Sequence, residues 1–392
     1  MKCTFLLLVV SVLVQGLTTV IAQTWTQTSA AVNFDCLSIA MSADGCKLAA
    51  VTSGAHPIYS TDAGATWHAN QSSPDAYLRI ASSADGTKLV APMLVSNSFS
   101  YPIGIFVSTD SGGTWTQTTA PPAYYWSAVA SSGFGDKLAA AFYTTSGFPN
   151  SAGGLVYVST NAGFSWSKGG SPTKSWSSLA CSADGNKIIA AAAGDKIYVT
   201  TNFGTSWAAT ASSTDGWSSV AANVDGTRLI ASGNATYVST NSGGSWRLAT
   251  PQTGVVASSA DGVKLIVAGN AIYTSSNSGV TWTSNSVPGG WSCVASSADG
   301  SEQVVGSSTF YGEGIWINRS MPSPRLNIQR AASNLQLSWL VPSTNFAPQF
   351  KSELNAAWVS LTNTPSLNAT NLQEQLTIAP SNNCGFFRLI AQ

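Results

Sequence analysis

The 392-residue chain carries little charge. Asp, Glu, Lys and Arg make up 9% of it, and 17 acidic residues balance 17 basic ones. No segment is rich in Lys or Arg, which argues against nucleic acid or an anionic membrane surface as a partner. The only histidines are His56 and His68. We therefore expect no histidine-based metal site, no Ser–His–Asp triad and no cofactor.

Cysteine is also scarce, with six in the chain. Cys3 lies in the N-terminal apolar segment, and the others are Cys36, Cys46, Cys181, Cys293 and Cys384. This odd, scattered set has neither metal-ligand spacing nor the pattern of a disulfide framework. Most of these residues are expected to be small core side chains. A Cys36–Cys293 bridge is the alternative, because both occupy inner strands of the predicted repeats.

Only one long apolar run occurs. Phe5–Val14 follows Lys2, and the segment Val20-Ile21-Ala22 before Gln23 resembles a small-residue cleavage site. These features predict a signal peptide at residues 1–22 and a secreted, periplasmic or cell-surface protein without an integral membrane segment. A retained membrane anchor is the competing interpretation, but the run is short for a span of about 20 residues.

Repetition is the strongest feature that is present. A motif of the form Ser-Ala-Asp-Gly-x-Lys-Leu recurs seven times, twice in degenerate form. The copies are Ser42–Leu48, Ser83–Leu89, Ser182–Ile188, Asn223–Leu229 and Ser259–Leu265, with degenerate copies at Gly133–Leu138 and Ser297–Gln303. An Asp-Gly turn between two short apolar runs predicts a β-hairpin.

A second motif, Ser-Thr-Asp/Asn-x-Gly-x-Thr/Ser-Trp, alternates with the first. Its six copies are Ser60–Trp67, Ser108–Trp115, Ser159–Trp166, Thr200–Trp207, Ser239–Trp246 and Ser275–Trp282. The Asp or Asn is expected to close an Asx-turn, the Gly to allow a tight bend, and the Trp to pack back on the sheet. The residues with this structural role are Asp62, Asp110, Asn161, Asn202, Asn241 and Asn277.

The second motif resembles the Asp-box (BNR) repeat of sialidases, sortilin-type receptors, xyloglucanases and the photosystem II assembly factor family. The resemblance implies a β-propeller, but it implies no activity because Asp boxes are structural turns. Sialidases use three arginines, a Tyr–Glu pair and an acidic Asp. The predicted propeller has Arg79, Arg228, Arg247 and Arg319. Arg228 and Arg247 belong to the wrong face, so sialidase chemistry is not expected.

The two ends of the repeat region complete one blade. Gly314–Ile317 matches a third strand with no Asp box after it, whereas Thr24–Gln27 matches Thr114–Gln117, the strand that follows an Asp box. We therefore predict an all-β chain with a seven-bladed β-propeller at residues 23–320, closed by pairing of its N- and C-terminal strands.

A different pattern begins at about Met321. Pro322-Ser323-Pro324 reads as a stiff linker, and residues 321–392 as a small β-sandwich-like domain. The segment resembles a small β-sandwich tail of secreted bacterial proteins through Leu337–Trp339, Trp358 and Phe386–Leu389. An accessory or attachment role is expected for it.

Residues that begin the inner strands are mostly aromatic. They are Cys36, Tyr77, Trp126, Trp176, Trp217, Thr253 and Trp291. Such a ring at the channel mouth could stack sugars, or its members could pack between blades. In propellers the ligand usually lies on the face opposite the Asp boxes, which the resemblance implies here as well.

Blades two and three break the symmetry. From the Lys of the first motif to the start of the second there are 20 positions in blade two and 22 in blade three, against 11 to 13 in blades one, five and six. Long insertions often carry function, or these loops could be self-packed shields. The predicted ligand-binding residues are Asp75, Tyr77, Arg79, Phe99, Tyr101, Tyr124, Tyr125, Trp126, Phe142 and Tyr143. Arg79 could instead form a structural ion pair with Asp35 or Asp75.

These features predict a secreted, non-catalytic binding or interaction propeller whose partner is a carbohydrate or another extracytoplasmic protein. The alternative is a glycoside hydrolase that acts on an extracellular polysaccharide with two carboxylates. Asp35, Asp75 and Asp215 lie in connections between blades and could supply such a pair. Nothing in their spacing demands catalysis, so no catalytic residue is assigned.

Overall fold

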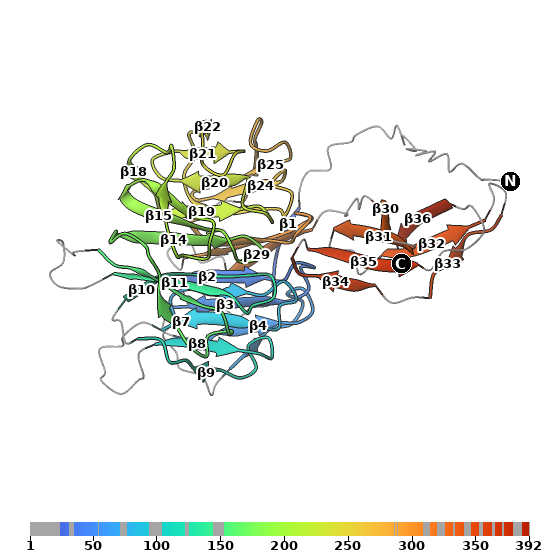
Figure 1. The fold of residues 1–392 in the computed structure, drawn as a ribbon, viewed down its shortest axis with the longest axis horizontal. Helices are drawn as coiled ribbons and strands as arrows, with labels where there is room; N and C mark the ends of the chain where they lie inside the picture. Colours follow the sequence, from blue (N-terminus) through green and yellow to red (C-terminus); the bar gives the residue numbers. More distant parts are fainter. Residues whose placement is uncertain are drawn as a thin grey trace.

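The computed structural model describes most of the chain from Thr24 to Ala391 (Figure 1). The residues outside this description are 1–23, 31–34, 54, 71–76, 94–103, 122–124, 144–152, 286, 288, 309–313, 320–325, 332–333, 341–345, 353–355, 363–364, 371, 379–385 and 392. The predicted signal peptide therefore lies outside the described residues. In the described part of the chain, all the secondary-structure elements are β-strands, and no helix is long and apolar enough to cross a membrane.

Seven antiparallel sheets form the blades of a propeller, as predicted. Blade one contains β2 (Cys36–Met41), β3 (Leu48–Thr52), β4 (Ile58–Ser60) and β5 (His68–Ala69). Blade two contains β6 (Ala81–Ser82), β7 (Leu89–Pro92), β8 (Ile105–Ser108) and β9 (Thr116–Gln117). Blade three contains β10 (Tyr125–Ser131), β11 (Leu138–Tyr143), β12 (Val156–Ser159) and β13 (Ser167–Lys168).

The remaining blades follow the same order. Blade four contains β14 (Trp176–Cys181), β15 (Ile188–Asp195), β16 (Ile197–Thr200) and β17 (Ala208–Ala209), with β18 (Asp215–Gly216) paired to β15. Blade five contains β19 (Ser219–Ala222), β20 (Leu229–Ser232), β21 (Thr236–Ser239) and β22 (Arg247–Thr250). Blade six contains β23 (Val255–Ser258), β24 (Leu265–Ala268), β25 (Ile272–Ser275) and β26 (Thr283–Asn285). Blade seven contains β27 (Trp291–Ser296), β28 (Glu302–Ser307), β29 (Ile315–Arg319) and β1 (Trp25–Gln27).

The ring closes through β1, which supplies the outer strand of the last blade from the other end of the propeller. Trp25, Thr26 and Gln27 pair with Asn318, Ile317 and Trp316 in antiparallel register. Trp25 is buried against the sixth blade through Ile272 and its neighbours. The predicted closure is therefore confirmed: the last blade is completed as a four-stranded sheet by a strand from the other end of the propeller.

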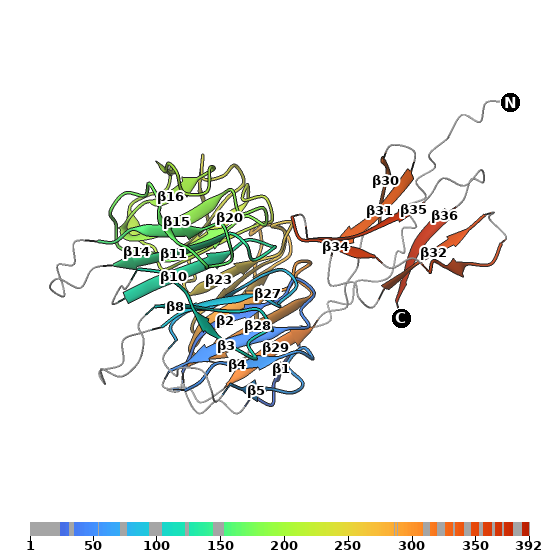
Figure 2. The same ribbon diagram turned by 60° about the horizontal axis from the view of Figure 1, so that its bottom comes forward.

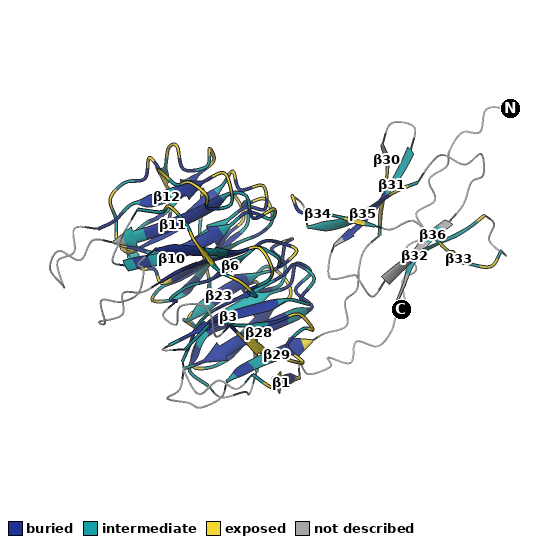
Figure 3. Cartoon of the chain, turned by 90° about the horizontal axis from the view of Figure 1, so that it is seen from below, coloured by how far each residue is buried: buried dark blue, intermediate teal, exposed yellow. Residues whose placement is uncertain are grey.

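The second strand of each blade is the most deeply buried, because neighbouring sheets cover both of its faces (Figure 3). Every residue of β3, β7, β20 and β24 is buried. Small and β-branched residues dominate these strands, as in the Leu-Ala-Ala-Val-Thr sequence of β3. They allow adjacent blades to pack closely on a pleated surface.

A closed ring of backbone hydrogen bonds links all seven Asp-Gly turns. In each turn the amide of the second motif residue donates to the carbonyl of its equivalent in the next blade, over 2.6 to 2.9 Å. The residues in order around the ring are Ala43, Ala84, Gly133, Ala183, Val224, Ala260 and Ala298. The ring holds the blades in register at one mouth of the channel and satisfies amides that would otherwise be buried without partners.

The C-terminal part folds as two small sheets. One orders β30 (Asn327–Ala331), β31 (Asn334–Leu340), β35 (Gln373–Ile378) and β34 (Ser366–Asn368), and the other orders β33 (Val359–Ser360), β32 (Phe346–Lys351) and β36 (Phe386–Ala391). Leu337, Trp339 and Leu376 form its core, with Phe387 and Leu389 of the second sheet packed against them. This is the β-sandwich-like domain that the sequence predicts, and β34 and β35 lie beside the propeller (Figure 2).

Candidate functional site

The six Asp boxes share one hydrogen-bonding pattern. In the first, the Ser60 hydroxyl donates to Asp62 over 2.8 Å and accepts from the Gly64 amide over 2.8 Å. The Thr66 hydroxyl and amide also donate to the Asp62 carboxylate. These hydrogen bonds lower the pKa of Asp62 to about 2, and the bond from the Thr66 hydroxyl contributes most to that shift. The residue before the glycine has a positive φ in every box, as Ala63 does at 57°. These side chains thus serve the turn itself.

Asp boxes and Asp-Gly turns lie on the same face of the propeller. One backbone amide of each box donates to a carbonyl of the Asp-Gly turn in its own blade, over 2.7 to 2.9 Å. The pairs are Ala63 with Cys46, Ser111 with Thr87, Ala162 with Asp136, Phe203 with Asn186, Ser242 with Thr227, and Ser278 with Val263. The connections between the second and third strands, including the longer ones of blades two and three, consequently leave from the opposite face.

The C-terminal domain occupies the channel mouth at the Asp-box face. Ala369, in the turn after β34, is buried in a cluster with alanines of the hydrogen-bonded ring, and Leu367 and Leu372 pack against that cluster. Gly133 takes the place of the ring alanine in blade three, and a methyl group there would overlap the Ala369 carbonyl. This mouth is therefore filled by the chain's own turn.

Blade seven carries an acidic residue at this face where the other blades carry a base. The bases are Lys47, Lys88, Lys137, Lys187, Arg228 and Lys264. Glu302 replaces them and lies 3.7 Å from the Arg319 guanidinium. Burial, with smaller contributions from Asp299 and Asp44, raises the pKa of Glu302 to about 7 despite the opposing effect of Arg319. Glu302 is thus a titratable group at the junction of blades seven and one.

Two of the predicted ligand contacts are core residues. Tyr77 is 1% exposed and Trp126 is fully buried. Tyr77 packs on Phe106 and Trp115, with ring centroids 5.6 and 5.3 Å apart. Trp126 packs edge-on against Phe142 at 5.5 Å.

Trp176 and Trp217, at the same position in blades four and five, make equivalent contacts with a Tyr of the third strand and the Trp of the Asp box. These aromatics pack the blades and offer no ring face to a ligand, which corrects the idea of a stacking platform.

The other predicted contacts divide into two groups. Arg79, Tyr125 and Phe142 are half-buried; Arg79 donates to the Leu78 carbonyl over 2.9 Å, and Phe142 packs against the core cluster that contains Trp126. Outside the described residues lie Asp75, Phe99, Tyr101 and Tyr124, and the Tyr143 side chain is not described either. The described members thus lie in blades two and three, and the joint ligand site that the sequence predicts stays a prediction.

A polar cluster that the sequence analysis missed lies on the face opposite the Asp boxes, at blade four. The Lys174 ammonium is 2.5 Å from the Asp195 carboxylate and 5.7 Å from the Tyr198 ring centroid. The hydrogen bond with Asp195 raises the pKa of Lys174 and lowers that of Asp195. Next to it, β18 brings Asp215 opposite Asp195 in the sheet. The signal for it was Asp195 in the turn between the second and third strands, where blades five and six carry only Gly-Asn-Ala.

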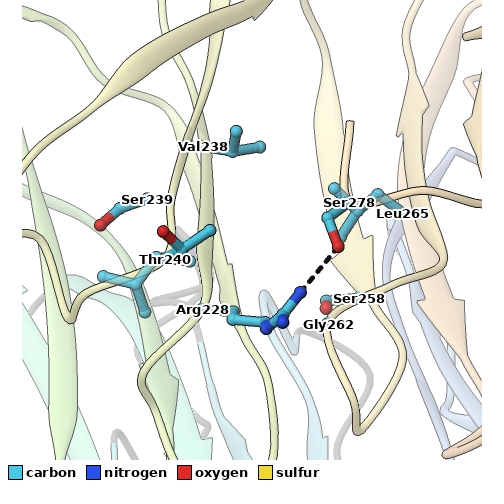
Figure 4. A pocket seen from close by; sticks show the side chains of 9 residues that line it. Arg228, Val238, Ser239, Thr240, Ser258, Gly262, Leu265 and Ser278 are labelled. Carbon is cyan, nitrogen blue, oxygen red and sulfur yellow. Dashed lines mark hydrogen bonds between the residues drawn. The ribbon is translucent and has the colours of Figure 1, made fainter. Parts of the chain in front are cut away.

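The clearest pockets among the described residues are small gaps between blades. One lies between blades five and six and is lined by Val238, Ser239, Leu265 and their neighbours, with Arg228 donating to the Ser278 hydroxyl over 2.8 Å (Figure 4). The other occupies the corresponding positions of blades two and three. Each has a volume of about 10 Å³, room for about one water molecule. Because the gap repeats, we assign it to packing.

Within the described part of the chain, no three His, Cys, Asp or Glu side chains are grouped as metal ligands. The candidate residues described at the face opposite the Asp boxes are thus half-buried side chains of blades two and three and the Lys174–Asp195 ion pair of blade four.

Comparison with known proteins identifies the class. A scan against models of protein families gives no match, and neither does a search of curated protein sequences. Among solved structures, the chain is similar to YCF48 bound to D1 peptide, with a TM-score of 0.55 and 19% identity over 76% of this chain and 97% of that one. It is also similar to YCF48 from Cyanidioschyzon merolae, with a TM-score of 0.55 and 16% identity over 75% of this chain and 98% of that one. The chain is a β-propeller, and it shares that fold with the YCF48 structures.

Proposed function

We propose that this chain is an exported, non-catalytic propeller that binds an extended segment of another protein at the face opposite its Asp boxes. The observation that carries the proposal is the filled mouth at the Asp-box face, where Ala369 sits within the alanine ring. The accessible mouth is then the one from which the longer connections of blades two and three leave. A structural neighbour is described as bound to a D1 peptide, which supports a peptide as the class of partner.

The contact surface that we propose is formed by residues 94–103 and 144–152 together with Arg79 and Tyr125. The two connections contain Phe99, Tyr101 and Phe148. Aromatic and arginine side chains are among those that most often dominate the energy of protein interfaces. Rigid blades beneath them limit the entropy lost on binding.

Carbohydrate binding and glycoside hydrolysis fit the described residues less well. The buried state of Tyr77, Trp126 and the equivalent tryptophans removes the ring of sugar-stacking faces. Among the candidate carboxylates, Asp215 accepts hydrogen bonds from the Gly216 amide and the Asn234 side chain. Asp195 is paired with Lys174. A carboxylate held in a turn or an ion pair is poorly placed to act as an acid or a nucleophile.

The test uses residues 23–392 against a phage-displayed peptide library and a glycan array. We expect selected peptides to bind saturably in calorimetry and the glycans to give no signal. Replacing 94–103 with the Gly233-Asn234-Ala235 connection of blade five should weaken peptide binding by roughly tenfold or more. The matched control is Phe164→Ser, an exposed change at an Asp box, which should bind as the wild type does.

Unchanged affinity in the shortened variant would contradict the proposed surface. Saturable glycan binding without any selected peptide would overturn the class of partner.

A further inference from the structure

Two cysteines meet at the seam where the propeller closes. Cys36 begins β2 in the first blade, and Cys293 lies in β27 of the last. Their Sγ atoms are 2.7 Å apart, and the residues are 0% and 4% exposed. Non-bonded carbon atoms rest about 3.5–4.0 Å apart, whereas a disulfide bond measures about 2.05 Å. The two thiols are thus in close contact, within reach of a disulfide bond.

The repeat itself changes at this seam. In three of the other six blades, the residue two positions after the start of the inner strand (after Cys36, Trp176 or Trp217) is a serine whose hydroxyl accepts a hydrogen bond from an amide of the next blade, over 3.1 to 3.2 Å. These pairs are Ser38 with Ile80, Ser178 with Val220, and Ser219 with Val256. In blade seven that position is Cys293. Across the seam, Cys36 occupies the position at which four other blades carry a tryptophan.

A third departure makes room for both sulfurs. Gly306 pairs with Cys293 in the sheet, and a methyl group added there would lie 2.6 Å from each of the two Sγ atoms. The corresponding residues of other blades have side chains: Val51, Ala141, Ala191, Ser232 and Ala268. Three changes in the repeat therefore converge on one sulfur pair, at the interface that joins the ends of the ring.

We propose that Cys36 and Cys293 form a disulfide bond that fastens the first blade to the last. The oxidant is another disulfide, either oxidised glutathione or a thiol oxidoreductase. One cysteine thiolate attacks it and forms a mixed disulfide, and the second thiolate displaces the outgoing thiolate. Overall, two protein S–H bonds become one S–S bond, and the two electrons and two protons pass to the oxidant, which leaves as two thiols.

The bond has to form while the ring is closing. Burial, together with the contact from Cys36, raises the pKa of Cys293 well above its usual value. The folded thiol form therefore contains little thiolate and admits no external disulfide. We expect oxidation to accompany folding and to be slow once a reduced ring has closed.

The bridge joins residues 257 positions apart, so it strongly restricts the unfolded chain. Structural disulfides persist in oxidising compartments, which agrees with the proposed export of the chain. The inference does not depend on the partner of the propeller, because the seam is distant in sequence from the connections of blades two and three.

Peptide mapping by mass spectrometry tests the bond directly. Residues 23–392 are folded with oxidised glutathione, alkylated under denaturing conditions and digested without reductant. We expect a linked peptide pair that contains Cys36 and Cys293, with Cys46 and Cys181 alkylated. Alkylation of Cys36 and Cys293 in this preparation, or linkage of either to another cysteine, would overturn the proposal.

Thermal unfolding gives an independent readout. Reductant should lower the melting temperature of the oxidised chain by roughly 5–10 °C, since it removes the constraint on the unfolded state. The Cys36→Ser/Cys293→Ser variant should show no response to reductant, while the matched control Cys181→Ser should respond as the wild type does. If the double variant fails to fold, the mapping of the wild-type chain decides. No effect of reductant on the wild type would contradict the bridge.

Discussion

At the scale of single residues, departures from the repeat carry more information than the repeat does. A side chain that recurs in every blade stabilises a turn or a sheet, as the Asp-box residues do. Gly133, Glu302, Gly306 and Cys293 each stand where the other blades carry a different residue. Each also meets a group that the other blades lack: the C-terminal turn, the Arg319 guanidinium or a second thiol.

Glu302→Gln is expected to change how stability depends on pH. Burial raises the pKa of Glu302 from 4.5 to about 7 in the folded chain. The folded state therefore binds this proton more tightly than the unfolded state, and the resulting stability is present below about pH 4.5 and lost as the pH rises through 7. The variant should match the wild type near pH 5 and exceed it by about 2 kcal/mol near pH 8. Urea unfolding at both pH values checks this, and equal effects at the two would contradict it.

At the scale of the turns and strands, the sequence predicted most of the architecture. Two alternating motifs gave the hairpins and the number of blades, and the match of Thr24–Gln27 to an outer strand gave the closure. The packing of Tyr77 and Trp126 could not be decided in this way. Strand alternation separates two faces, but it does not tell whether a face meets the channel or the neighbouring blade.

The buried serine of each Asp box should contribute more than the exposed one. The Ser239 hydroxyl donates to Asn241 and accepts from the Gly243 amide over 2.9 Å. Ser239→Ala removes the partner of the buried Gly243 amide, so we expect a loss of about 1–3 kcal/mol of unfolding free energy. Ser245→Ala in the same turn removes an exposed hydroxyl, and it should cost about 0.5 kcal/mol or less. Denaturant unfolding compares the two, and equal losses would contradict the expectation.

At the scale of the whole molecule, the two folded parts meet, among the described residues, around the turn after β34. This contact is hard to predict from the sequence, because Ala369 lies in a short polar segment and its role depends on residues far away in the chain. Only Gly133 hinted at it, as a glycine at a position occupied elsewhere by alanine or valine. Contacts between parts joined by a linker depend on shape complementarity, which no local pattern encodes.

Gly133→Ala is expected to displace the C-terminal turn without harming the ring. The other blades carry a side chain at this position and keep the same backbone hydrogen bonds, so the propeller should tolerate the methyl group. The added methyl would overlap the Ala369 carbonyl. We expect faster amide exchange in residues 366–370 and an unchanged melting transition of the propeller. The control Gly216→Ala adds a methyl with only the Asn234 side chain nearby, at 3.9 Å. Equal protection of residues 366–370 in the two variants would argue against docking.

The ring of seven amide-to-carbonyl bonds has a direction as well as a closure. Every blade donates to the blade that follows it, and the last donates to the first, so all the peptide dipoles circulate in the same sense around the channel. In such a closed ring of hydrogen bonds, no blade is the first or the last. Every blade therefore donates one such hydrogen bond and accepts one, whichever blade contains the chain termini.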